Sequence, residues 1–160
     1  MKLLRVVIFL SGLLLIGSKA FAEDLVLFET ITETKQFHMA EKNKANDVGI
    51  VTRVGDVRFT ENGPVIGQFY HKVSIIHVNE INQFDMREFT RSIQLPEGEI
   101  YTLMYFKGQP QKLVQKGDQF RGVILGGTGI YAGIKGTFDI SVITPGDINS
   151  VHREVLHIQR

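Results

Sequence analysis

The chain has 160 residues, with 18 Lys and Arg, 17 Asp and Glu, no Cys and a formal net charge of +1. This length fits a single domain that can bury a sizeable core. The near balance of charge argues against a basic nucleic-acid-binding face, and the absence of Cys excludes disulfides and thiolate metal sites.

Residues 1–22 have the features of a secretory signal peptide. Two basic residues precede an apolar run over residues 6–16, and an Ala-Phe-Ala sequence ends at Ala22. This order is typical of a cleaved export signal, and the apolar run is shorter than the roughly 20 residues that span a bilayer. We expect cleavage before Glu23 and an exported protein, periplasmic or secreted. Residues 23–160 then form one domain of net charge −2 with no membrane span.

The rest of the chain alternates between strand-like stretches and turn residues. Apolar and polar residues alternate with period two between Gly, Pro, Asn and Asp, which is typical of half-buried strands. Strands are predicted over residues 25–38, 48–59, 65–78, 87–95, 99–106, 119–125, 134–142 and 151–158. This pattern, with no sustained helical periodicity, predicts an all-β sandwich or a closed antiparallel barrel.

A glycine-rich segment joins the sixth and seventh of these strands. By spacing alone, Gly127-Thr128-Gly129 followed by Gly133 looks like a dinucleotide-binding fingerprint. That fingerprint needs a helix directly after the glycines, whose N-terminal N–H groups face the pyrophosphate. Here the following residues alternate as a strand does. The segment is therefore predicted to be a barrel turn in which glycines permit tight bends and close chain approach.

The same segment carries a family resemblance. Residues 123–136, Val-Ile-Leu-Gly-Gly-Thr-Gly-Ile-Tyr-Ala-Gly-Ile-Lys-Gly, are similar to the glycine-rich segment of plant allene oxide cyclases and dirigent proteins. Residues 27–29, 55–60 and 65–67 resemble further family motifs in the same order. The family fold is an eight-stranded antiparallel closed barrel with a mostly apolar cavity, and members are commonly trimers. The resemblance implies this fold, a small hydrophobic ligand and a homotrimer.

Glu29 is the candidate catalytic residue. It matches a first-strand glutamate that helps delocalise charge in allene oxide cyclases, whereas the cyclase asparagine two residues later is Ile31 here. The dirigent Arg-Glu pair is also not reproduced, because Phe120-Arg121 occupies that region. If Glu29 faces the interior, desolvation is expected to raise its pKa and suit it to general acid–base catalysis. The alternative is an exposed Glu29, or one paired with an arginine such as Arg58.

The candidate ligand-binding residues come from two strands, with Phe69, His71 and Val73 on one and Tyr101 and Tyr105 on the other. Residues 99–106 are apolar on both faces, so one face can line the barrel while the other meets a partner subunit or is covered by a loop or terminal segment. The histidines are too dispersed along their strands to share a metal ion. No metal or cofactor is expected.

Three functions remain open at this stage. The first is an exported barrel that binds a small hydrophobic molecule without turnover. The second is an isomerase- or cyclase-type enzyme, or a stereochemical auxiliary, that uses Glu29. The third is a structural exported oligomer. An open cavity on which polar groups converge with Glu29 favours chemistry, an aliphatic cavity favours binding, and a filled interior excludes both.

Overall fold

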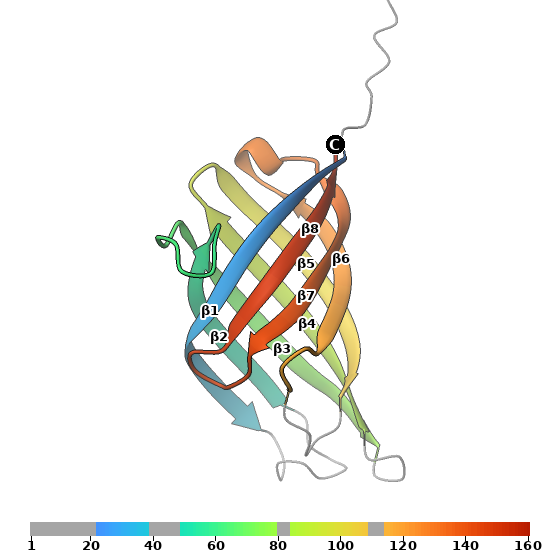
Figure 1. The fold of residues 1–160 in the computed structure, drawn as a ribbon. Helices are drawn as coiled ribbons and strands as arrows, with labels where there is room; N and C mark the ends of the chain where they lie inside the picture. The colour runs from blue at the N-terminus through green and yellow to red at the C-terminus, as the bar shows by residue number, and fades with distance from the viewer. Residues whose placement is uncertain (1–21, 39–48, 80–83, 109–113) are drawn as a thin grey trace, which may run out of the picture.

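The computed structural model describes residues 22–38, 49–79, 84–108 and 114–160, so the predicted signal peptide lies outside the described residues. The elements are β1 (Ala22–His38), β2 (Gly49–Arg58), β3 (Gly67–Asn79), β4 (Phe84–Leu95), β5 (Gly98–Gly108), β6 (Gln119–Gly127), η1 (Gly129–Tyr131), β7 (Lys135–Thr144) and β8 (Val151–Gln159). The eight strands form one closed antiparallel barrel in sequence order (Figure 1). The predicted all-β class is confirmed, and of the two predicted architectures the structure has the closed barrel and not the sandwich.

Closure of the barrel depends on the pairing of its first and last strands. β1 and β8 pair antiparallel from Ala22 opposite Gln159 to Thr30 opposite Val151. Beyond Thr30, β1 continues past a bulge between Ile31 and Glu33 and pairs with β2 alone. Because the sheet closes on itself, it avoids the long unpaired edges that favour aggregation. All eight strands match the predicted segments to within a few residues.

The glycine-rich segment forms the turn between β6 and β7, as predicted, and closes one end of the barrel. The backbone N–H of Thr128 donates to the Glu99 carbonyl at 2.9 Å, and that of Ile130 donates to the Glu97 carbonyl at 3.1 Å. Gly129 has a φ of 59°, and a Cβ at this position would overlap the Glu97 carbonyl oxygen. A glycine is therefore required where the turn presses on the β4–β5 connection. The turn places Tyr131, which is buried, over the barrel interior.

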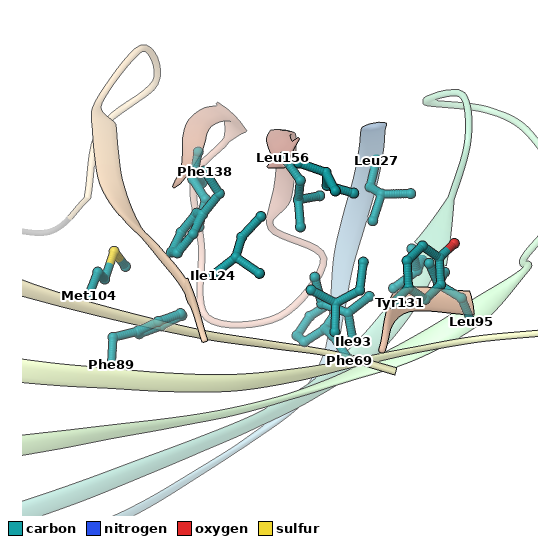
Figure 2. Close-up of a cluster of buried hydrophobic side chains, with 14 of the residues drawn as sticks. Leu27, Phe69, Phe89, Ile93, Leu95, Met104, Ile124, Tyr131, Phe138 and Leu156 are labelled. Atoms are coloured by element: carbon teal, nitrogen blue, oxygen red, sulfur yellow. The ribbon is translucent and has the colours of Figure 1, made fainter. Parts of the chain in front are cut away.

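The interior-facing side chains form three layers along the barrel axis. From the barrel end that carries Ala22 and Gln159, the first layer consists of Phe69 on β3, Ile93 on β4 and Leu156 on β8. The second layer consists of His71, Arg91 and Glu154 on the same three strands. The third layer consists of Val73, Phe89 and His152. The first layer, together with Leu27, Tyr131 and Phe138, forms an apolar plug; Figure 2 shows these side chains along with Phe89 and Met104, which line the cavity. The second layer is charged, and the third lines a cavity. The barrel is thus filled at one end only.

Candidate functional site

Four buried ionisable side chains from four strands meet between the plug and the cavity. They are Glu29 on β1, His71 on β3, Arg91 on β4 and Glu154 on β8, each at most 4% exposed, and we call them the ionic cluster. Arg91 donates through Nη1 to Glu29 Oε2 at 3.2 Å and through Nη2 to Glu154 Oε1. His71 Nε2 lies 3.5 Å from Glu29 Oε2. One guanidinium therefore bridges two carboxyl groups inside the barrel.

Aromatic rings surround the ionic cluster and limit its contact with water. The ring of His71 stacks on Phe69 with centroids 4.1 Å apart and meets Phe89 edge-on at 4.6 Å. The Arg91 guanidinium lies 4.9 Å from the centroid of the Phe138 ring, within range of a cation–π interaction. These contacts fix the side chains in a medium of low dielectric constant, where electrostatic interactions between them are strong.

The two carboxyl groups of the ionic cluster have opposite pKa shifts. Burial acts to raise the pKa of Glu29, but Arg91 and then His71 outweigh it and lower that pKa to about 2. Burial raises the pKa of Glu154 to about 8; Arg91 opposes this shift, and the charge on Glu29 adds to it. Burial also lowers the pKa of His71 to about 3, so this imidazole is neutral. At neutral pH the two carboxyl groups share one negative charge and one proton.

This arrangement corrects the expectation for Glu29. The residue does face the interior, but its pKa is lowered rather than raised, because its partner Arg91 outweighs desolvation. The alternative partner Arg58 binds Asp56 instead, at 2.9 Å. Sequence reasoning missed Arg91 and Glu154. The available signal was their position along the strand. Each stands in the alternating series of apolar residues that face the core, where a charged side chain without a partner is not expected.

A cavity of about 90 Å³ lies on the other side of the ionic cluster from the plug. Its apolar lining includes Val73, Phe89, Met104 and Phe106, and its polar lining comprises Arg53, Arg87, Ser150 and His152. It lies toward the barrel end where β7 connects to β8, since Gly146 and Ser150 contribute to it. Glu29 and Glu154 do not line this space; they lie beneath it.

The predicted ligand-binding residues are divided among several locations. Val73 lines the cavity, whereas Phe69 belongs to the plug and His71 to the ionic cluster. Tyr101 and Tyr105 do not line this cavity, because both lie on the outer face and are 36% and 54% exposed. The inward residues of β5 have the opposite parity, as Thr102 does, and both faces of this strand are apolar enough to hide that parity in the sequence.

His152 is the ionisable imidazole of the cavity, and its hydrogen bonds fix its tautomer. The Ser150 hydroxyl donates to the Thr144 carbonyl at 2.8 Å, so it accepts from His152 Nε2, which lies 3.0 Å away. Nδ1 of the neutral ring is therefore unprotonated. Burial lowers the pKa of His152, with Glu29 opposing and Arg53 reinforcing the shift. The cavity thus has a neutral histidine that can act as a base.

His157, the remaining histidine with a described side chain, lies on the outer face of the barrel. It contacts Asp24 at 2.7 Å and Asp139 at 3.1 Å. The side chains of His38 and His77 lie outside the described residues. Within the described ranges, no group of three or more His, Asp or Glu side chains is arranged to hold a metal ion. The same ranges contain no helix with the length and apolar character needed to cross a membrane.

Comparison with known proteins gives a match at the level of structure. No protein-family model matches the chain, and no curated protein matches it in sequence. The structure resembles pyocyanin demethylase with a TM-score of 0.62 and 19% identity, covering 85% of this chain and 99% of that one. It resembles the Diels-Alderase AbmU from Streptomyces koyangensis with a TM-score of 0.63 and 16% identity, covering 90% and 70%.

A dirigent protein is similar to the chain as well. The pterocarpan synthase dirigent protein GePTS1 matches with a TM-score of 0.60 and 10% identity, covering 88% of this chain and 86% of its own. At such identities the likeness concerns the fold and not the reaction. It agrees with the resemblance carried by the glycine-rich segment. The chain therefore has a closed-barrel fold similar to that of these proteins, which is the fold that the resemblance implies.

Proposed function

We propose that this protein is an exported barrel that binds a small, largely apolar molecule in the cavity above the ionic cluster. The observation that carries the proposal is the half-filled interior, in which the plug is packed but the cavity end is open. A cavity of about 90 Å³ is smaller than the roughly 150 Å³ that holds a benzene molecule. The ligand is therefore small, or only part of it enters. The structures of similar fold are named for reactions on small organic molecules, which supports this class of ligand.

Native mass spectrometry of protein purified from its own host tests the binding proposal. We expect a co-purifying small molecule with the wild-type protein and none with Val73→Phe, which fills the cavity. Val65→Phe is the matched control, because Val65 is 51% exposed in the connection between β2 and β3. Retention of the same ligand by Val73→Phe would refute binding in this cavity. A wild-type protein that holds no ligand and binds no added apolar probe would refute the function.

A second candidate is an isomerase- or cyclase-type enzyme, or a stereochemical auxiliary. The observation in its favour is the unequal pair of carboxyl groups, since titratable neighbours with divergent pKa values are typical of acid–base sites. Because Glu29 and Glu154 lie beneath the cavity, His152 is the group that would exchange a proton with a substrate. In this candidate, His152→Gln abolishes turnover of the co-purifying ligand while its binding persists. Unchanged turnover would exclude His152 from this role.

We also propose that the barrel assembles as a homotrimer. Exposed apolar side chains gather on the outer faces of neighbouring strands β5 and β6, with Tyr105, Val123 and Leu125 at 54%, 45% and 59% exposure. Exposed apolar patches of this kind are typical of subunit interfaces. Light scattering coupled to size-exclusion chromatography should give three times the monomer mass for the wild-type protein. The Leu125→Lys variant should give the mass of a monomer. A monomeric wild-type protein would contradict the trimer.

A further inference from the structure

Arg53 on β2 brings a cationic group into the largely apolar cavity. Not all of its N–H donors have a close acceptor. Its side chain lines the cavity next to Val51, and its Nε atom is buried with no hydrogen-bond partner in the described part of the chain. Arg53 Nη2 lies 3.8 Å from Asp147 Oδ1, and the Asp147 side chain is itself 68% exposed. A guanidinium presents a planar fork of N–H donors that suits a carboxylate, so a guanidinium whose ion-pair partner stays 3.8 Å away can bind an anion in the cavity.

Apart from Asp147, the charged side chain nearest to Arg53 in the cavity lining is cationic. Arg87 of β4 lines the same cavity, with its guanidinium 5.7 Å from the centroid of the Phe106 ring, and no Asp or Glu is among the described lining residues. Glu29, the ionised carboxylate beneath, already binds Arg91. Burial lowers the pKa of Arg53 and Arg87 reinforces this effect, although Asp147 opposes it. An anion placed in this cavity would relieve the repulsion between the two arginines.

We infer that the cavity ligand is an organic anion, with a small apolar body that packs against Phe89, Met104 and Phe106 and a compact anionic group that binds the guanidinium of Arg53. This inference rests on the proposed binding function and names its ligand class. A neutral apolar ligand would displace water from the cavity and desolvate the Arg53 guanidinium without pairing its charge, which weakens binding. An inorganic anion would satisfy Arg53 but leave the apolar lining without contacts.

Isobutyrate and its neutral counterpart isobutyramide, whose apolar bodies are smaller than benzene, provide a direct test. We would titrate each into the full protein and follow backbone amide chemical shifts of β3 and β4 by NMR, at constant ionic strength. Wild-type protein should bind isobutyrate at least about tenfold more tightly than isobutyramide, as expected for one charge-assisted hydrogen bond. Inorganic phosphate, which lacks an apolar body, should bind more weakly than isobutyrate.

The variants locate the preference at Arg53. Arg53→Met should bind both probes about equally, and Arg53→Lys should retain part of the preference because it keeps the charge but not the planar fork. Arg153→Met is the matched control, since Arg153 is exposed on the outer face of β8, and it should behave as wild type. If Arg53→Met does not fold, the wild-type protein and Arg53→Lys decide the matter.

The outcomes separate this inference from the binding function itself. Equal affinity of the wild-type protein for isobutyrate and isobutyramide would overturn the anionic ligand while leaving cavity binding intact. Equal or tighter binding of phosphate, or an unchanged isobutyrate preference in Arg53→Met, would overturn it as well. If neither organic probe shifts the amides of β3 and β4, both the inference and the proposed function fail.

Discussion

Glu154→Gln should make the protein more stable at pH 7, although it alters a fully buried polar residue. The Glu154 carboxyl group has a pKa raised to about 8, mainly by burial, so it is protonated in the folded protein at pH 7. In the unfolded chain the same group has its ordinary pKa near 4.5 and is ionised. Folding at pH 7 therefore has to reprotonate Glu154. A glutamine has the same shape, accepts from Arg91 through the same oxygen, and needs no proton.

The magnitude follows from linkage between protonation and folding. For a group whose folded pKa is raised, the stabilisation is complete below the unfolded pKa of 4.5 and is lost as pH rises to about 8. The loss is at most about 1.4 kcal/mol per pH unit, so at pH 7 it reaches up to roughly 3 kcal/mol. Glu154→Gln removes this loss. The variant should match the wild-type protein near pH 4.5 and exceed its unfolding free energy by about 1–3 kcal/mol at pH 7.

Urea unfolding followed by far-UV circular dichroism measures this difference, because the chain has no Trp to report by fluorescence. Glu97→Gln in the exposed β4–β5 turn is the control and should stay within about 0.5 kcal/mol of wild type at both pH values. A double variant, Glu29→Gln with Glu154→Gln, leaves Arg91 without any carboxylate and should lose about 3–5 kcal/mol. A Glu154→Gln variant that is destabilised at pH 7 would refute the assignment of the proton to Glu154.

Three further perturbations test the rest of the barrel by the same urea assay. Phe69→Ala should cost about 3–5 kcal/mol, because it empties part of the fully buried plug, and a cost below about 1 kcal/mol would contradict close packing there. Gly129→Ala should cost about 1–3 kcal/mol, since the left-handed backbone at φ 59° meets the Glu97 carbonyl; a neutral effect would mean that the turn relaxes freely. The two carboxylate partners of His157 raise its pKa. The resulting stabilisation of the folded protein should be complete below about pH 6.5 and be lost as the pH rises through the raised pKa. His157→Gln should abolish this pH dependence, and an unchanged stability profile in the variant would exclude the contribution of His157.

Strand positions were largely readable from the sequence, because they depend on local patterns. Period-two alternation on residues 134–142 and the glycine-rich turn before them are properties of short segments, and the structure places β7 and the turn there. Closure itself came from the family resemblance, since alternation alone allows a sandwich. The pairing of Ala22 with Gln159 is a contact between distant segments that no local pattern contains.

The candidate site was only partly readable, because it depends on which strand faces meet in space. Glu29 was identified from the sequence as a candidate catalytic residue, but its ionised state could not be predicted. The direction of its pKa shift is decided by Arg91, which lies 62 residues away in the chain. The inner or outer position of Tyr101 and Tyr105 could not be predicted because β5 is apolar on both faces, so the alternation does not reveal which face is inside. A charged residue within an otherwise apolar face, as at Arg91 and Glu154, is the sequence signal that deserves more weight in barrels.

The ionic cluster has a cost that the plug does not have. Replacing a buried ion pair by apolar side chains of similar volume is often neutral or stabilising, and here one carboxyl group must also be held protonated. The plug proves that this barrel can fill its interior with Phe69, Ile93 and Leu156, which are fully buried. A barrel with a purely structural role would gain stability by continuing that packing through the position of Arg91. The placement of charged groups where the packing stops, directly beneath a cavity that contains Arg53 and His152, therefore favours a ligand-dependent role over a structural one.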